Sequence, residues 1–421
     1  MRIFGISRRD WEQRIVKISA LIWRRLLFRT TFVAITGSVG KTTTKELLAA
    51  VLPSQGATLA TVDSRNSAIE VARTILGVRP WHRFVVLEIG TDRPGWIRSS
   101  TRLARPDIAV VLKVGRTHTD RFPTLEDTAR EKAALLSTLG RRGVAILNQD
   151  DPRVAAMAEG HKFRVVRFGE SDQADVRATE MAAIFPERLS LTVIARGESE
   201  RVQTNLVGTH WAAAVLAAAA AALECGVPLA RIAEAFNRVQ PTPGRLDPRI
   251  LPSGAVVLRD DFNGALETFN VAFAVLREAS AKRKILAVST VSDSDEGWDK
   301  RLCRIVFDAA AACDMVVLIG TAKDTQRAVR SAAAAGMAPE VVHCFTTIRD
   351  AAGFLRGVLR AGDLLLLRGR YSDHMGRLFH ALTEEVRCWL DRCELPVLCE
   401  KCPRLYAENA ESLPVPRRGD S

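Results

Sequence analysis

The sequence has few aromatic residues and few lysines, and it has no long apolar run. Aromatic residues make up 6% of the chain, tyrosine occurs only 2 times, and only 11 of the 60 basic residues are lysine. The longest apolar candidate, Trp211 to Leu223, is rich in alanine and shorter than the roughly 20 residues that a membrane-spanning helix needs. We therefore expect a buried helix there and no transmembrane helix.

The N-terminus also lacks the apolar core of a secretory signal, because Arg8 and Arg9 follow almost at once. Without such a signal, the 8 cysteines predict reduced thiols and a cytoplasmic protein. Four of them have the spacing C-x4-C-x5-C-x2-C in the tail: Cys388, Cys393, Cys399 and Cys402. A zinc site prefers two C-x2-C units and the tail has one, so we favour an ordinary tail over a zinc site.

The charge balance favours an anionic partner. The net charge is +12, which suits nucleotides, nucleic acids or lipid headgroups. Nucleic-acid binding is disfavoured because no aromatic-rich motif or reader helix accompanies the charge. The hydrophobic fraction of 47% and the charged fraction of 26% are typical of globular proteins and exclude disordered and fibrous classes. A length of 421 residues predicts two or three domains.

Residues 10–29 have the periodicity of an amphipathic helix with basic flanks. The apolar positions on one side are Trp11, Ile15, Ile18, Ile22 and Leu26. We favour a helix packed on the domain that follows. The alternative is a basic amphipathic helix that contacts a membrane surface or a protein partner.

A phosphate-binding loop follows. The apolar run Thr31 to Thr36 predicts a buried strand, and a helical stretch resumes at Lys45, so a strand, a glycine-rich loop and a helix occur in order. The loop residues are Gly37, Ser38, Val39, Gly40, Lys41, Thr42 and Thr43. Backbone N–H groups of such a loop bind phosphates, its lysine bridges the β- and γ-phosphates, and its threonine hydroxyl binds Mg²⁺.

Alternating strands and helices continue along the chain and predict an α/β fold with a mostly parallel sheet. Further strands are expected at 83–90, 107–112 and 143–148, with Glu88, His118 and Asn148 at or just past their carboxyl ends, where such sheets bind ligands. A helix is expected at 125–139, and antiparallel strands are expected at 189–193 and 202–207. After a break at 241–245, strands recur at 255–258, 284–288, 315–319, 341–345 and 363–367. We predict a helix at 1–30, domains at 31–240 and 241–385, and a partly disordered tail at 386–421.

Seven short motifs follow the loop in a fixed order. They are S-R-N-S with Asn66, E-I-G-T-D-R-P-G with Glu88, A-R-E-K with Lys132, N-Q-D-D with Asn148, G-T-H with His210, G-R-L-D with Arg245, and D-D-F-N with Asp260 and Asn263. In these motifs the chain resembles the Mur ligases, the ATP-dependent amide-forming enzymes of peptidoglycan precursor synthesis, and most closely their D-alanyl-D-alanine-adding members. The resemblance runs from Val33 to Leu382 and implies a P-loop central domain with a smaller Rossmann-like C-terminal domain.

The resemblance implies roles for individual residues. It implies catalytic roles for Lys41, Glu88, His118, Lys132 and His210. It implies Mg²⁺ binding by Thr42, Glu88, His118 and Lys132, the lysine of this family being typically carbamylated. It implies ATP contacts by the loop and by Asn148, Arg245, Asp260 and Asn263. Candidate substrate contacts are Asn66, Arg368 and Arg370.

The chain departs from the family pattern on the substrate and adenine sides. Two asparagines that the family places near the adenine are Trp211 and Ala214 here, and the family's K-G-S reads Arg368-Gly369-Arg370. Only one expected helix precedes the P-loop, where the family carries a domain for UDP-linked substrates. The leading hypothesis is a Mur-type carboxylate–amine ligase that acts through an acyl phosphate. Alternatives are an amino-acid-polymer ligase, like cyanophycin or polyglutamate synthetases, and an ATP-binding protein that does not ligate.

Overall fold

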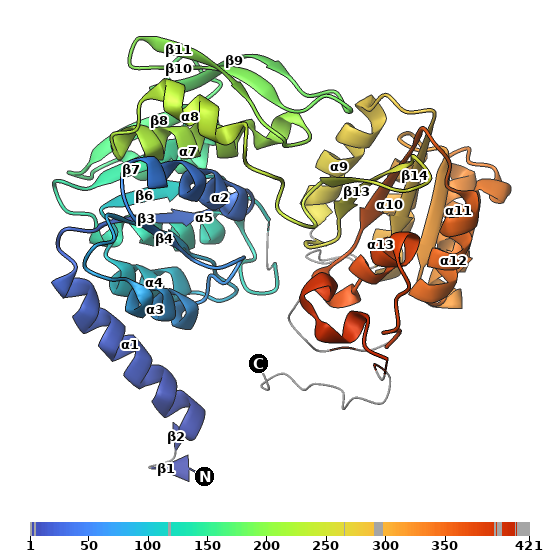
Figure 1. Cartoon of the computed structure of the whole chain (residues 1–421), viewed down its shortest axis with the longest axis horizontal. Helices are drawn as coiled ribbons and strands as arrows, with labels where there is room; N and C mark the ends of the chain where they lie inside the picture. Colours follow the sequence, from blue (N-terminus) through green and yellow to red (C-terminus); the bar gives the residue numbers. More distant parts are fainter. Residues whose placement is uncertain are drawn as a thin grey trace. The chain divides into compact units, whose positions relative to one another are not determined.

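The chain folds into two compact units, which Figure 1 draws in sequence colours. The computed structural model describes residues 2–3, 6–116, 119–264, 266–289, 298–390, 393, 398–408 and 410. Unit 1 comprises Met1–Ala183, Arg188–Asn205 and Thr209–Gln240, and unit 2 comprises Ile184–Glu187, Leu206–Gly208 and Pro241–Ser421. His118, a predicted site residue, lies outside the described residues.

Unit 1 is built on a nine-stranded sheet with the order β11-β10-β9-β8-β7-β6-β3-β5-β4. The strands from β4 to β9 run parallel, and β9, β10 and β11 pair antiparallel. Their bounds are β3 Thr31–Thr36, β4 Thr58–Ala60, β5 Phe84–Glu88, β6 Ile108–Val111, β7 Val144–Asn148, β8 Arg164–Gly169, β9 Val176–Ala182, β10 Ser190–Ala195 and β11 Glu198–Gln203. A short pair, β1 Arg2–Ile3 and β2 Ile6–Ser7, precedes them.

Helices cover both faces of this sheet (Figure 1). On one face lie α2 (Lys41–Val51), α7 (Ala212–Glu224) and α8 (Leu229–Phe236), and on the other lie α1 (Arg8–Leu26), α3 (Ala68–Gly77), α4 (Trp96–Ala104), α5 (Leu125–Ala133) and the short α6 (Pro152–Ala155). Almost every residue of the alanine-rich α7 is buried, which confirms the helix expected there. No helix in the described ranges is long and apolar enough to cross a membrane.

Unit 2 contains a six-stranded sheet with the order β12-β13-β17-β14-β15-β16. Only the β12–β13 pair is antiparallel. The strands are β12 Asp247–Ile250, β13 Val256–Asp260, β14 Arg283–Val288, β15 Met315–Ile319, β16 Val342–Phe345 and β17 Asp363–Arg368, and the helices are α9 Leu266–Glu278, α10 Trp298–Ala309, α11 Ala322–Ala334, α12 Ile348–Val358 and α13 Gly376–Thr383. Leu364 and Leu366 of β17 enter one core while Leu365 and Leu367 enter the other, as expected for a strand buried on both faces.

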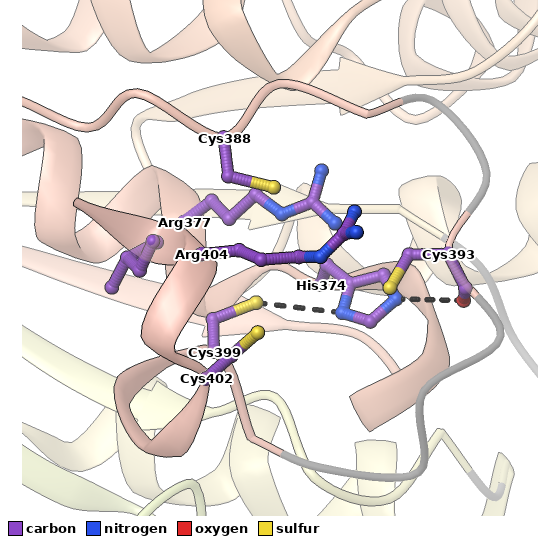
Figure 2. A pocket seen from close by; sticks show the side chains of 8 residues that line it. His374, Arg377, Cys388, Cys393, Cys399, Cys402 and Arg404 are labelled. Atoms are coloured by element: carbon purple, nitrogen blue, oxygen red, sulfur yellow. Dashed lines mark hydrogen bonds between the residues drawn. The ribbon is translucent and has the colours of Figure 1, made fainter. Parts of the chain in front are cut away.

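The described part of the tail packs onto unit 2. Val386, Cys399 and Leu405 belong to the same core as α12 and α13. Figure 2 shows four free cysteines around one small cavity together with His374, Arg377 and Arg404. The cysteines are Cys388, Cys393, Cys399 and Cys402. His374 connects two parts of the tail to unit 2, because one ring nitrogen lies 3.4 Å from Cys399 Sγ and the other lies 2.9 Å from the Cys393 carbonyl oxygen. Within the described residues, no three His, Cys, Asp or Glu side chains are arranged to hold a metal ion.

Candidate active site

The loop between β3 and α2 needs glycine at two positions. Gly40 has a φ of 86° immediately before α2, which is the left-handed region that glycine adopts without strain. A Cβ on Gly37 would lie 2.8 Å from Leu112 Cβ, so any larger residue would displace the end of β6. The loop therefore turns tightly at the edge of the sheet. The N–H groups in the first turn of a helix point out of its N-terminal end, where they can bind an anion.

Two side chains of the loop fix its shape. Ser38 Oγ accepts the Gly115 N–H at 2.8 Å and lies 3.0 Å from the Gly115 carbonyl oxygen, so the loop is tied to the segment that follows β6. Lys41 Nζ donates to the carbonyl oxygens of Gly37 at 2.8 Å and Ser38 at 3.4 Å. The ammonium group thus lies over the same loop whose backbone would bind the phosphates.

Glu88, at the end of β5, lies directly beside the loop. One of its carboxylate oxygens accepts a hydrogen bond from Thr42 Oγ1 at 2.9 Å, and the other accepts one from Asn66 Nδ2 at 2.8 Å. The side chain is 1% exposed. A hydroxyl and a carboxylate are hard oxygen donors of the kind that Mg²⁺ prefers, so these residues fit a nucleotide-bound Mg²⁺ ion.

The loop over residues 61–66 supports this arrangement, and apart from Asn66 its contacts were not predicted from the sequence. Lys45 is 1% exposed, and its Nζ donates to the carbonyl oxygens of Thr61 at 2.8 Å and Asp63 at 2.6 Å. Thr61 Oγ1 accepts the Glu88 N–H at 3.0 Å, and the Ser64 hydroxyl lies 3.0 Å from that of Thr42. A lysine within the buried face of α2 was the one available signal, because such a group needs nearby acceptors.

Lys132 is buried near the end of α5. Burial, and secondly the positive charge of Lys41, lower the pKa of Lys132 to about 7. The neighbouring Glu131 opposes this shift. Its carboxylate accepts the N–H groups of Gly95 at 2.7 Å and Ile97 at 2.8 Å at the start of α4. The positive charge of Lys41 in the phosphate-binding loop thus affects the pKa of Lys132, although the two residues lie in different helices.

His210 and Asn148 also belong to unit 1. His210 lies in the helical turn Thr209–Trp211 that leads into α7, and burial lowers its pKa to about 3, so the imidazole is neutral. Asn148 uses its amide on the backbone, donating to the Leu112 carbonyl oxygen at 2.7 Å and accepting the Asp150 N–H at 2.9 Å. In this structure Asn148 therefore joins the ends of β6 and β7.

In unit 2, the fully buried Arg368 forms an ion pair with the mostly buried carboxylate of Asp260. Arg368 is 0% exposed, donates to the Asp260 carboxylate and to Thr268 Oγ1, and lies 3.9 Å from the centroid of the Phe269 ring. Burial raises the pKa of Asp260 and lowers that of Arg368, although each group counteracts the shift of the other. Arg368 thus holds Asp260 in place and has no exposed surface with which to meet a substrate.

The other predicted residues of unit 2 are more accessible. The Arg245 guanidinium lies 4.6 Å from the centroid of the Phe262 ring, and Asn263 is half-buried just after β13. The Arg370 side chain is 42% exposed, while its backbone N–H donates to Asp373 at 3.0 Å. Of the two arginines proposed as substrate contacts, only Arg370 presents its side chain to solvent.

We expect Arg368→Met to lower the free energy of unfolding by about 3–5 kcal/mol, because it leaves the buried Asp260 carboxylate without its charged partner. The measurement is equilibrium urea unfolding followed by circular dichroism. Arg231→Met is the matched control, since Arg231 pairs with Glu234 on the surface and such pairs contribute about 0–1 kcal/mol. Equal stability of the two variants would contradict a structural role for the Asp260–Arg368 pair.

Comparisons with known proteins identify the family of the chain. The sequence profile of the Mur ligase middle domain matches residues 35–222, and that of the Mur ligase glutamate ligase domain matches residues 244–371. The UDP-N-acetylmuramoyl-tripeptide--D-alanyl-D-alanine ligase of Escherichia coli (strain K12) is 31% identical over 322 residues, which cover 74% of this chain and 70% of that protein. The chain belongs to the Mur ligase family. The family resemblance predicted from the motifs is confirmed.

Solved structures of Mur ligases share the fold. A crystal structure of MurF from Acinetobacter baumannii superposes with a TM-score of 0.80 at 25% identity, over 88% of this chain and 80% of that one. MurF of Thermotoga maritima in complex with ADP superposes with a TM-score of 0.76 at 19% identity, over 91% of this chain and 86% of that one. The predicted α/β fold class is therefore confirmed for this Mur ligase.

Proposed function

We propose that this Mur ligase uses ATP to join a carboxylate to an amine in peptidoglycan precursor synthesis, through an acyl phosphate and with release of ADP and phosphate. The arrangement of Thr42, Glu88 and Asn66 beside the phosphate-binding loop carries the proposal. The relatives support this function over amino-acid-polymer synthesis and over ATP binding without ligation. The cytoplasmic location expected from the sequence stays a prediction.

The residues of unit 1 suit the first step, in which a carboxylate oxygen attacks the γ-phosphorus and ADP leaves. Both reactants are anionic, so the site must offset their repulsion. Backbone N–H groups of the loop and the Lys41 ammonium would bind the phosphates, while Asn66 orients Glu88. Mg²⁺, when held by Thr42, Glu88 and the proposed ligands His118 and Lys132, supplies further positive charge at the phosphates. In the second step the amine attacks the acyl carbon and phosphate leaves.

The test of this function is a product assay with defined substrates. The protein would be incubated with ATP, Mg²⁺, UDP-N-acetylmuramoyl-tripeptide and D-alanyl-D-alanine, with each substrate omitted in turn. We expect ADP and phosphate only when the acid and the amine are both present. ATP binding without turnover would favour the non-ligating alternative, and AMP among the products would overturn the acyl-phosphate route.

We further propose that Lys132 is carbamylated. A buried amine with a pKa of about 7 has a substantial neutral fraction at physiological pH, so its lone pair can attack CO₂, forming an N–C bond and releasing a proton. After incubation with ¹³C-bicarbonate we expect a carbamate resonance in the ¹³C NMR spectrum of the wild-type protein. The resonance should vanish in Lys132→Ala and remain in Lys162→Ala, where an exposed lysine is removed. A resonance that survives Lys132→Ala would belong to another amine.

A substitution at Gly90 tests whether the reaction requires Asn66 to position the Glu88 carboxylate. Its N–H donates to the Asn66 carbonyl oxygen at 3.1 Å, and a Cβ there would lie 2.5 Å from Asn66 Oδ1. Gly90→Ala should displace Asn66 and slow ADP formation by about 10²-fold, as expected when a positioning group shifts by an ångström. Gly140→Ala is the control, because its Cβ would meet nothing within 4 Å. Equal rates of ADP formation in Gly90→Ala and Gly140→Ala would mean that the reaction does not depend on the position of Asn66.

A further inference from the structure

Helix α1 is firmly held on unit 1 by one of its faces. Trp23 Nε1 donates to the Val78 carbonyl oxygen at 2.9 Å, and Arg24 donates to the Ala104 carbonyl oxygen at 2.7 Å. Ala20 and Leu27 are buried in the same core as residues of α3, α4 and β3. Figure 1 shows α1 at the border of the unit, with its C-terminal part beside α3 and α4 and its N-terminal half extending beyond them. The first alternative from the sequence, a helix packed on its domain, therefore describes this face.

The opposite face of α1 is apolar and exposed. Its five large side chains are 44–60% exposed: Trp11 44%, Ile15 52%, Ile18 59%, Ile22 57% and Leu26 60%. Their spacing of three and four residues places them in one stripe along the helix. Phe28, just past the helix end, is 81% exposed. A contiguous apolar stripe of this kind marks an interaction surface, whereas single exposed apolar residues need no explanation.

From Ile15 to Leu26 the charges along the stripe are basic, whereas Trp11 at its N-terminal end lies between the exposed Asp10 and Glu12. From Gln13 to Arg29 the chain has no acidic residue. Arg14 and Arg25 each directly precede a residue of the stripe, and both are exposed, as is Arg29 beyond the helix. Arg24 does not contribute, because it points inward and pairs with Asp107. The outward surface of α1 thus combines an apolar stripe with a basic border.

We propose that α1 lies flat on an anionic membrane surface, with its apolar stripe at the boundary between headgroups and acyl chains. Amphipathic helices that bind in this way have apolar side chains on one face and arginines or lysines that meet lipid phosphates. Trp11 and Phe28 lie at the two ends of the stripe, and tryptophan in particular favours the interfacial depth. Charge complementarity favours lipid over a second copy of this chain, because pairing two copies would bring basic borders together. The proposal does not depend on the ligase reaction.

Flotation of the full-length protein with vesicles tests this proposal. One vesicle type contains equal parts of phosphatidylcholine and phosphatidylglycerol, and the other contains phosphatidylcholine alone. We expect the wild-type protein to float with the anionic vesicles at least 10-fold more than with the neutral ones. The triple variant Ile15→Ser, Ile18→Ser, Ile22→Ser should lose this binding at least 10-fold while its circular dichroism spectrum stays unchanged, because the three side chains point away from unit 1.

The matched control removes three equally exposed apolar side chains elsewhere. Ile184, Ile250 and Phe307 are 57%, 80% and 51% exposed, and their replacement by serine should leave flotation at the wild-type level. Equal loss in both triple variants, or no flotation of the wild-type protein, would overturn the proposal. So would a concentration-dependent dimer in analytical ultracentrifugation that the α1 variant abolishes, because the stripe would then be covered by a second copy.

Discussion

Lys41→Ala is expected to reduce ADP formation by about 10³-fold or more. The ammonium group of Lys41 lies over the loop between β3 and α2 and would meet the β- and γ-phosphates, where negative charge must be stabilised during transfer. Lys45, the other lysine of α2, cannot replace it, because Lys45 is buried and bound to the carbonyl oxygens of Thr61 and Asp63. Steady-state measurement of ADP release with both substrates present provides the test.

The control for Lys41→Ala is Lys162→Ala, which removes an exposed lysine outside the phosphate-binding loop. It should turn over like the wild-type protein. Lys41→Ala should also unfold at the same urea concentration as the wild-type protein, since the ammonium group donates to backbone carbonyl oxygens of the loop at Gly37 and Ser38 and forms part of no apolar core. Turnover within a few-fold of wild type in Lys41→Ala would contradict the assignment of the loop.

The buried parallel strands could be predicted from the sequence because they are short apolar runs between turns. Residues 315–319, for example, were expected as a strand and form β15. The strands β8 and β9 were missed, since Arg164, Arg167, Arg177 and Glu180 interrupt their apolar pattern. Both strands lie inside the sheet, but several of their side chains are partly or fully exposed, and polar residues are tolerated at those positions. The helix predicted over 125–139 ends sooner, because α5 stops at Ala133 and tightens into a 3₁₀ helix over Ala134–Thr138.

The core of the candidate site could be predicted because it depends on strand ends alone. Glu88 is the last residue of β5, and Thr42 lies in the first turn of α2, just after the loop that leaves β3. The two strands are adjacent in the sheet, with Ile35 beside Glu88. The supporting contacts of Ser64 and Lys45 depend on the path of the loop over residues 61–66, which no periodicity encodes.

The ion pair between Asp260 and Arg368 shows the same limit in unit 2. The two residues are far apart in the sequence, and each was assigned separately, Asp260 to the nucleotide and Arg368 to the substrate. They are register partners in the parallel β13–β17 pair, so the sheet topology places them side by side. Because strand order cannot be read from the motifs, the sequence could not reveal that one residue neutralises the other.

Glu88→Gln is expected to slow ADP formation by about 10²-fold and to raise the Mg²⁺ concentration needed for half-maximal rate. The substitution keeps the size of the side chain and an acceptor for Asn66 or Thr42, but it removes the negative charge that a divalent cation requires. A Mg²⁺ titration at saturating ATP separates this effect from a folding defect, because misfolded protein lowers the maximal rate without shifting the midpoint.

The matched control for Glu88→Gln is Glu170→Gln, which replaces an exposed glutamate just past the carboxyl end of β8. It should leave both the maximal rate and the Mg²⁺ midpoint unchanged. Glu88 is buried, and its two oxygens accept hydrogen bonds from Thr42 of the loop and from Asn66. Among the described residues, no basic side chain forms an ion pair with this carboxylate. A buried charge without such a partner is costly unless a cation compensates it. An unchanged Mg²⁺ midpoint in Glu88→Gln would therefore mean that the cation binds elsewhere and that Glu88 serves only to align Thr42 and Asn66.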